Sequence, residues 1–186
     1  MADQSRPRDD AARLFLLVLR CQAGSEEAFT QLVDWFGGRT LAHLRRLVGD
    51  DAEDVQQDVW LTVYRHLRRL DNPRAFRTWL FQTTRHRAID FLRARKRERE
   101  LVEEAARDVE AATIPDDTLA ALDESVLGPA LAELPAPQRE VLLLRYQEDM
   151  NYGEIAVVAG CSIGTVRSRL HHARRRLQDA MERRRA

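Results

Sequence analysis

The side chains with the clearest chemical character lie between Ser162 and Leu177, near the end of the chain. Apolar residues at spacings of three and four put one face of a helix toward a core; they are Ile163, Val166, Leu170, Ala173 and Leu177. The rest of that helix presents polar side chains, which are Thr165, Arg167, Ser168, Arg169, His171, His172, Arg174, Arg175 and Arg176. A helix with one packed face and one arginine-rich face has the chemistry to enter a DNA major groove.

The residues before this helix favour the same interpretation. A shorter helical pattern over 151–159 ends at Gly160-Cys161-Ser162, which predicts a helix-turn-helix. Ser162 is a natural N-cap for the second helix, and a helix N-terminus can itself point at phosphate. The alternative is an amphipathic helix whose basic face is only solvated.

A second group mixes aromatic and cationic side chains between Phe76 and Arg97. Opening a DNA duplex requires surfaces that stack an unpaired base and hold displaced phosphates, and aromatic rings with arginines supply both. An extruded base also needs polar groups at its edge. The candidates are Asn72, Arg74, Arg77, Gln82, Arg85, His86 and Arg87. Trp79, Leu80 and Phe91 are interpreted as core residues.

A third group is acidic and begins the helix near Ala52. Acids in a first turn favour the helix dipole, and the apolar line of this helix is Val55, Val59 and Val63. A different face, spaced i, i+3, i+4 and i+7, could dock on another protein; its residues are Asp54, Gln57, Asp58 and Leu61. The alternative is that these acids only cap and solvate the helix.

No pattern in the sequence indicates catalysis, a cofactor or a metal. Phosphate-binding glycine loops, zinc-protease pairs and nucleophile elbows are missing from it. His171 and His172 would point about 100 degrees apart on a helix, and a structural zinc site needs about four ligands. Cys21 and Cys161 have no neighbouring cysteine and are interpreted as packing residues in a reducing interior.

Composition and periodicity predict an all-α chain of two small helical domains joined by a flexible linker. Its 186 residues carry a formal net charge of zero, but two basic zones flank an acidic one, and local charge matters more than net charge to a phosphate backbone. The predicted domains are 12–97 and 126–181, with an acidic linker over 98–125. No apolar run is long enough to span a membrane and no signal peptide is apparent, so a cytoplasmic location is expected.

Local signals set the expected helix ends. Ser25 is predicted as an N-cap, Gly37-Gly38 as a break between two helices, and Pro137 as a first-turn residue. A longer helix is expected from about Pro73 or Phe76 to Arg97.

Three segments together resemble the extracytoplasmic-function (ECF) group of bacterial RNA polymerase sigma factors, in the sigma-70 family. Residues 52–60, AEDVQQDVW, are similar to the acidic core-binding helix of that group. Residues 76–92, FRTWLFQTTRHRAIDFL, are similar to its promoter-melting segment, and 134–146, LPAPQREVLLLRY, with the helix-turn-helix, to its C-terminal DNA-binding domain. The ordered combination is far more specific than the helix-turn-helix alone.

The resemblance implies a non-enzymatic sigma factor that binds core RNA polymerase and directs it to promoter DNA, without a cofactor. The first domain would read the minus-ten element and the second the minus-thirty-five element. By this resemblance Arg167, Ser168 and His171 lie where base contacts are made. Thr165, Arg169 and Arg175 are better placed for the backbone, with Ser162 at the helix start. The resemblance also implies an anti-sigma partner. His86 departs from the asparagine frequent at its position in the family, which affects the expected base preference.

Two other classes of function are compatible with parts of the sequence. A free-standing helix-turn-helix transcriptional regulator would use residues 134–177 for DNA and the N-terminal half for sensing or dimerisation. The acidic face and the aromatic–arginine segment argue against it. A DNA-acting enzyme, such as a recombinase, would need a catalytic cluster, which the sequence does not offer.

Overall fold

The computed structural model describes residues 6–105 and 127–185, and every regular element within them is helical. The first part of the chain contains α1 (Arg6–Gln22), α2 (Glu26–Val48), η1 (Gly49–Asp51), α3 (Ala52–His66), η2 (Leu67–Arg69), η3 (Pro73–Ala75) and α4 (Phe76–Ala105). The second contains α5 (Leu127–Ala132), α6 (Ala136–Tyr146), α7 (Tyr152–Ala159) and α8 (Ile163–Arg185). The predicted all-α class is confirmed.

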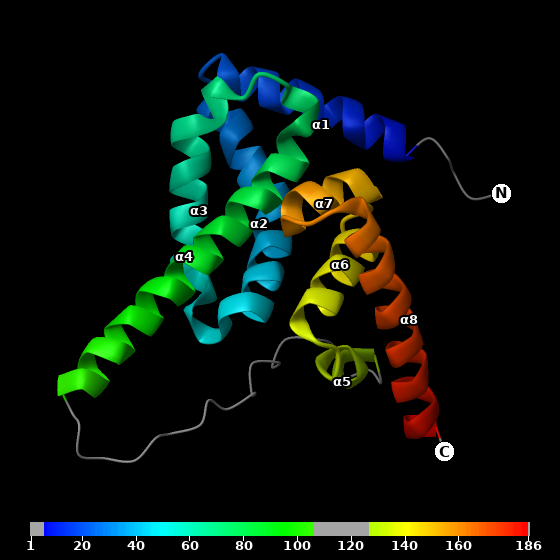
Figure 1. Ribbon diagram of the computed structural model, residues 1–186. Helices are drawn as coiled ribbons and strands as arrows, with labels where there is room; N and C mark the ends of the chain where they lie inside the picture. The colour runs from blue at the N-terminus through cyan, green and yellow to red at the C-terminus, as the bar shows by residue number, and fades with distance from the viewer. Residues whose placement is uncertain (1–5, 106–126, 186) are drawn as a thin grey trace.

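The first domain is a bundle in which α2, α3 and α4 pack on one another, and α1 lies across one end of α2 and α3 (Figure 1). Phe36, Val59, Phe76 and Leu80 are fully or almost fully buried between the helices. The rings of Phe36 and Phe76 meet edge to face with centroids 5.7 Å apart. Burial of a large apolar side chain stabilises a fold by about 1.5–3 kcal/mol, so this core can hold the short bundle together.

Two helix starts follow the expected signals. The Ser25 hydroxyl accepts a hydrogen bond from the Ala28 backbone N–H at 3.2 Å at the start of α2. Pro137 lies in the first turn of α6, where its missing N–H costs nothing.

The predicted break at Gly37-Gly38 is wrong, because α2 runs through both glycines without interruption. Two glycines cost a helix about 1 kcal/mol each relative to alanine. Burial of Leu32, Phe36 and Leu44 on both sides of the pair outweighs that cost, as tertiary packing commonly does.

The second domain is a helix-turn-helix built on α6, with α7 and α8 as its two helices. Asn151 begins α7 with a capping box that also uses Glu154. Gly160 ends α7 in the left-handed region, at φ 60° and ψ 43°, which a residue without Cβ adopts most readily. Val166, Leu170 and Ala173 then anchor α8 in the core.

The helix α4 extends to Ala105, eight residues past the end predicted at Arg97. The remainder of the predicted linker, residues 106–125, lies outside the described residues. The helical backbone therefore continues into the acidic stretch instead of ending with the basic one.

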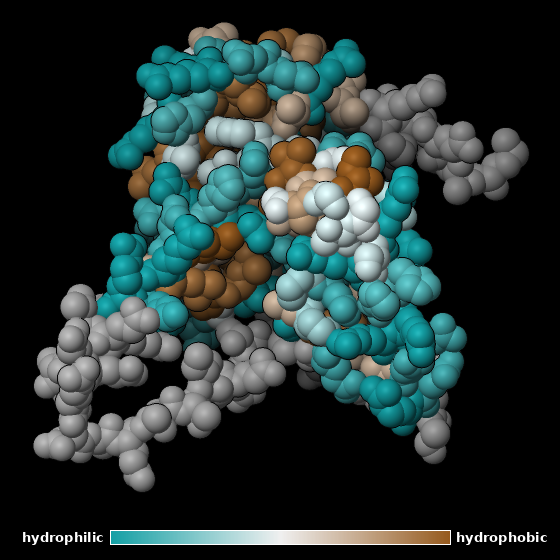
Figure 2. All heavy atoms as spheres, viewed as in Figure 1, coloured by the Kyte–Doolittle hydropathy of each residue, from teal (hydrophilic) through white to brown (hydrophobic). Residues whose placement is uncertain are grey.

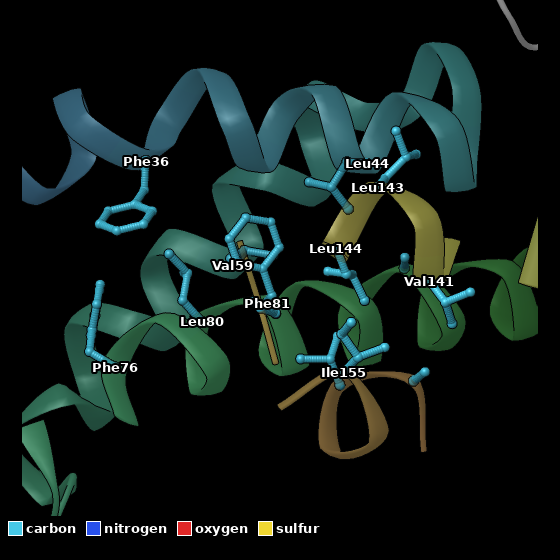
Figure 3. Close-up of a cluster of buried hydrophobic side chains, with 14 of the residues drawn as sticks. Phe36, Leu44, Val59, Phe76, Leu80, Phe81, Val141, Leu143, Leu144 and Ile155 are labelled. Carbon is cyan, nitrogen blue, oxygen red and sulfur yellow. The ribbon is translucent and has the colours of Figure 1, made fainter. Parts of the chain in front are cut away.

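The two domains pack on each other. The α7 helix lies against α4 (Figure 1), and buried side chains of both domains form one continuous apolar cluster. Figure 3 shows Leu143 and Leu144 of α6 next to Leu44 and Phe81 of the first domain, with Ile155 of α7 on the other side. The two domains that carry the predicted DNA-contacting residues are therefore docked on each other.

Candidate nucleic-acid and polymerase interfaces

The outer face of α8 carries the polar residues that the sequence predicted. Ser162, Arg167, Ser168, His171 and Arg175 are exposed, and Thr165 and Arg169 are half-buried. Hydrophilic side chains cover α8 in the view of Figure 2. Because the opposite face is fixed in the core, these side chains have a defined direction away from the domain.

The N-terminus of α8 is capped as predicted. The Ser162 hydroxyl accepts from the Thr165 backbone N–H at 3.0 Å and lies 2.9 Å from the Thr165 hydroxyl. Arg169 differs from its neighbours, since its Nη1 lies 3.6 Å from the Cys161 sulfur. Its guanidinium therefore packs on the turn.

Ile163 does not join the core of the second domain, although its spacing placed it on the apolar face. Its side chain is 46% exposed, as is that of Val157 on α7 at 50%. At the first turn of α8 the spacing pattern therefore overestimates how far the core extends.

A cavity of about 420 Å³ opens beside the segment that links α3 to α4. It is lined by Thr62, His66, Arg69, Leu70, Asp71, Asn72, Trp79 and Thr83. Only Asn72 among these was a predicted site residue. A polar side chain on the short Leu70-Asp71-Asn72-Pro73 connection was an available signal for Asp71.

Trp79 and Phe91 were interpreted as core residues, but both are only partly buried, whereas Leu80 is fully buried. The indole of Trp79 forms part of the cavity wall. This half-buried indole has one side packed on the core and one side open to the cavity.

Three of the predicted minus-ten residues lie near this cavity or the helix that borders it. The Asn72 side-chain oxygen accepts from the Arg74 N–H at 3.1 Å and so begins η3. The Arg74 guanidinium lies over the Phe15 ring, 5.2 Å from its centroid. Arg87 is exposed, and its Nε donates to the Thr62 hydroxyl at 3.1 Å.

The other predicted minus-ten residues are divided between solvent and the second domain. His86 is exposed and Gln82 is half-buried. Arg77 and Arg85 face glutamates of the second domain, at 3.7 Å from Glu154 and 2.8 Å from Glu140. The structure therefore does not gather all seven residues into one open surface.

The two ion pairs differ in burial, since Arg77 and Glu154 are both 29% exposed and only Glu140 is withdrawn from solvent. Glu140 is 7% exposed, and this burial raises the pKa of its carboxyl group, while the neighbouring Arg85 lowers it. A buried carboxylate is costly unless a cation and hydrogen bonds compensate for lost water. Arg85 is thus the group that compensates the buried carboxyl of Glu140.

The acidic helix α3 has the two faces expected of it. Val55, Val59 and Val63 are buried. The predicted docking residues Asp54, Gln57, Asp58 and Leu61 are all exposed. Tyr64, which is 57% exposed, extends this face by one more turn and was not predicted. An acidic surface with apolar residues at one end can dock on a partner of mixed basic and apolar character.

Within the described residues, no group of three or more His, Cys, Asp or Glu side chains could hold a metal ion. A search of the same residues finds no helix with the length and apolarity to cross a membrane.

Sequence comparison places both domains. Residues 32–98 match the family model of Sigma-70 region 2, and residues 127–177 match that of Sigma-70, region 4. The chain is 32% identical to the RNA polymerase sigma-H factor of Pseudomonas aeruginosa, over 89% of this chain and 92% of the relative. It is 30% identical to the ECF RNA polymerase sigma-E factor of Haemophilus influenzae, over 89% and 94%. The chain belongs to the ECF group of the sigma-70 family.

This sigma factor directs RNA polymerase to specific promoters, as its two matched regions and its relatives show. Its fold is similar to that of CnrH in complex with the cytosolic domain of CnrY, with a TM-score of 0.62 and 28% identity over 91% of this chain and 97% of that one. It is also similar to the sigma factor RpoE in complex with the anti-sigma factor NepR from Bartonella quintana, with a TM-score of 0.60 and 29% identity over 83% and 96%.

Proposed function

We propose that this sigma factor contacts the minus-thirty-five element through α8, the minus-ten element through the cavity beside α4, and core polymerase through the exposed face of α3. The observation that carries the proposal is the orientation of α8. Its apolar positions Val166, Leu170 and Ala173 are buried, so its polar face must point outward, as a major-groove helix requires. Arg167, Ser168 and His171 contact bases, and Ser162, Thr165, Arg169 and Arg175 contact the backbone.

The cavity beside α4 suits an unpaired base of the minus-ten element. Trp79 supplies an aromatic face, and stacking of this kind contributes about 1–3 kcal/mol per base. Because the Asn72 oxygen accepts from the Arg74 N–H, its amide N–H groups are left to donate to a base edge. Arg74 and Arg87, with the exposed His86, border the path of the displaced strand, and Gln82, Arg77 and Arg85 extend it along α4.

The face of α3 made by Asp54, Gln57, Asp58 and Leu61, with Tyr64, binds core polymerase. Its exposure in the docked arrangement supports this role, since binding there requires no movement of the second domain. Anti-sigma factors occupy the two similar structures, and a protein of that class is the expected inhibitor here. The protein works in the cytoplasm and has no catalytic activity of its own.

Run-off transcription with purified core polymerase tests the docking face. The double variant D54A/D58A is expected to lose core binding at least roughly ten-fold, because two charges leave a contact worth about 1 kcal/mol or more per pair. The matched control is E26A/D34A, which removes an exposed first-turn acid and a second exposed acid from α2. Unchanged core binding by D54A/D58A would reject the assignment.

The same assay separates a sigma factor from a free-standing regulator. Start-site selection must depend on adding this protein to core polymerase. Tight, sequence-specific binding to promoter duplex without polymerase would favour the regulator.

A further inference from the structure

The contact between the domains is built from arginines of the first domain and glutamates of the second. Glu140 on α6 pairs with Arg85, with Oε1 2.8 Å from Nε. Glu154 on α7 lies 3.7 Å from Arg77 and accepts a hydrogen bond from the Thr78 hydroxyl at 3.3 Å. Both arginines belong to the surface proposed for minus-ten DNA.

A third ion pair across the domain contact involves α2 of the first domain. Arg39 on α2 approaches Glu148 to 3.1 Å and donates to the Gln147 carbonyl oxygen at 2.9 Å. Glu148 is 5% exposed, so this contact is as deeply buried as that of Glu140. The three glutamates come from α6, the α6–α7 connection and α7, and each meets an arginine of the first domain. We call these three residues the acidic side of the second domain.

We propose that this acidic side competes with nucleic acid for Arg77 and Arg85 and thereby holds the polymerase-free protein in a closed, DNA-refractory form. The identification of these arginines as a DNA surface comes from the proposed function, on which this inference rests. A carboxylate that occupies an arginine satisfies the same donors that a phosphate would use. The carboxylates of Glu140 and Glu154 therefore take the place that backbone phosphates would take on Arg85 and Arg77.

The physical reason for closure lies in the difference between the two states. In the closed form the Arg85 and Arg77 side chains are 24% and 29% exposed. Each has lost much of its hydration and needs its carboxylate, because a charge withdrawn from water without a partner is costly. In the open form water hydrates both groups, so loss of the carboxylate penalises only the closed form. Replacing Glu140 and Glu154 with glutamine should thus shift the population toward the open form, although apolar contacts such as Leu143 with Leu44 remain.

The first measurement is an interdomain distance in the free, full-length chain. Spin labels at Thr30→Cys on α2 and Gln178→Cys on α8, both exposed, are introduced with Cys21→Ala and Cys161→Ser. We expect a narrow distance distribution in this parent and a broader, longer one in E140Q/E154Q. The control E53Q removes an ion pair with Arg45 within the first domain and should retain the narrow distribution.

The second measurement is affinity for a short, single-stranded oligonucleotide of mixed sequence. If about nine-tenths of the parent is closed, opening raises the apparent affinity roughly ten-fold. E140Q/E154Q should show this gain and E53Q should not. A charge swap, R85E/E140R, should regain the narrow distance that E140R alone loses, with circular dichroism confirming that each variant is folded.

Each outcome decides the proposal. A broad interdomain distance distribution in the parent would mean that the free protein is already open. An unchanged distribution in E140Q/E154Q would mean that the ion pairs do not hold it closed. Either result overturns the inference and leaves the proposed function standing. If the variant opens but neither form binds the oligonucleotide, the minus-ten assignment itself fails, and the competition with it.

Discussion

Arg167 is the exposed arginine of α8 that lies nearest the N-terminal end of the helix, where a major-groove helix reads base edges. Arg167→Ala should weaken transcription from promoters with the preferred minus-thirty-five element and reduce the preference over a substituted element. A bidentate arginine–guanine pair contributes about 1–3 kcal/mol of discrimination. Run-off transcription on paired promoters, with core binding measured in parallel, checks the effect.

Arg175→Ala provides the comparison for Arg167, because its side chain is also exposed on α8 and is assigned to phosphate. Phosphate contacts fix position without reading sequence, so this variant should weaken all minus-thirty-five sequences by a similar factor. If Arg167→Ala also lowered every sequence equally, its role in base reading would be rejected.

The buried side chain of His43 should make the free energy of unfolding depend on pH. It is 4% exposed, packs edge to face on Phe81, and its pKa is lowered to about 4, first by burial and then by Arg46 and Arg85. The unfolded chain binds this proton at an ordinary pKa near 6.5, and the native protein does not. The free energy of unfolding should therefore fall as the pH drops from 6.5 toward 4, by up to about 1.4 kcal/mol per pH unit.

Urea unfolding between about pH 7 and 5.5 should show this decline in the wild type and a flatter profile in His43→Gln. The window matters because burial raises the pKa values of Glu140 and Glu148. Those groups bind protons more readily in the native protein, so acidification below the window works in the opposite direction. Equal slopes in wild type and His43→Gln would mean that His43 is not kept neutral by the fold.

At the scale of elements, the uninterrupted α2 helix leads to a stabilising substitution. A Cβ at Gly37 or Gly38 would meet no atom within 4 Å apart from the helix backbone and chain neighbours. Gly37→Ala and Gly38→Ala should therefore each raise the free energy of unfolding by about 0.5–1 kcal/mol. Thermal unfolding measures the gain.

Gly160→Ala is the opposing case, since Gly160 has a φ of 60°. Alanine there must adopt a left-handed conformation at a cost of about 1 kcal/mol. A loss of stability at Gly37 or Gly38 comparable with that at Gly160 would show that the α2 backbone is strained at the pair.

Local chemistry explains which elements could be predicted. Several predicted features depend only on neighbours within a few residues, and the structure confirms each of them. They are the Ser25 and Ser162 caps, Pro137 in a first turn and the buried valines of α3. Gly37-Gly38 was misjudged because its propensity cost is overcome by packing partners distant in sequence. The cavity beside α4 was missed in part because its wall combines the end of α3 with the start of α4.

At the scale of the whole molecule, the docking of the two domains could not be predicted. Arg85 and Glu140 are separated by 55 positions, and nothing in their local sequence links them. Charge blocks suggested that the acids lay in the linker, whereas the glutamates that meet arginines of the first domain across the contact lie on α6, on α7 and between them. A buried ion pair is specified by tertiary packing, which a one-dimensional pattern of charge does not contain.

The last prediction concerns salt and the whole chain. When single-stranded DNA binds, each phosphate neutralised by an arginine releases counterions, so the logarithm of affinity falls with the logarithm of salt by about 0.7 per contact. In the wild type, transfer of Arg77 and Arg85 to phosphate also frees Glu154 and Glu140, which take up cations and reduce the net release. Glutamine at these positions takes up none.

The salt dependence of oligonucleotide binding should therefore be steeper for E140Q/E154Q than for the wild type, by at most about 1.4 for two contacts. Fluorescence anisotropy over a series of salt concentrations measures both slopes, and E53Q should match the wild type. A higher affinity with an unchanged slope would mean that opening exposes some other DNA-binding group, since the release of Arg77 and Arg85 to phosphate must appear in the ion balance.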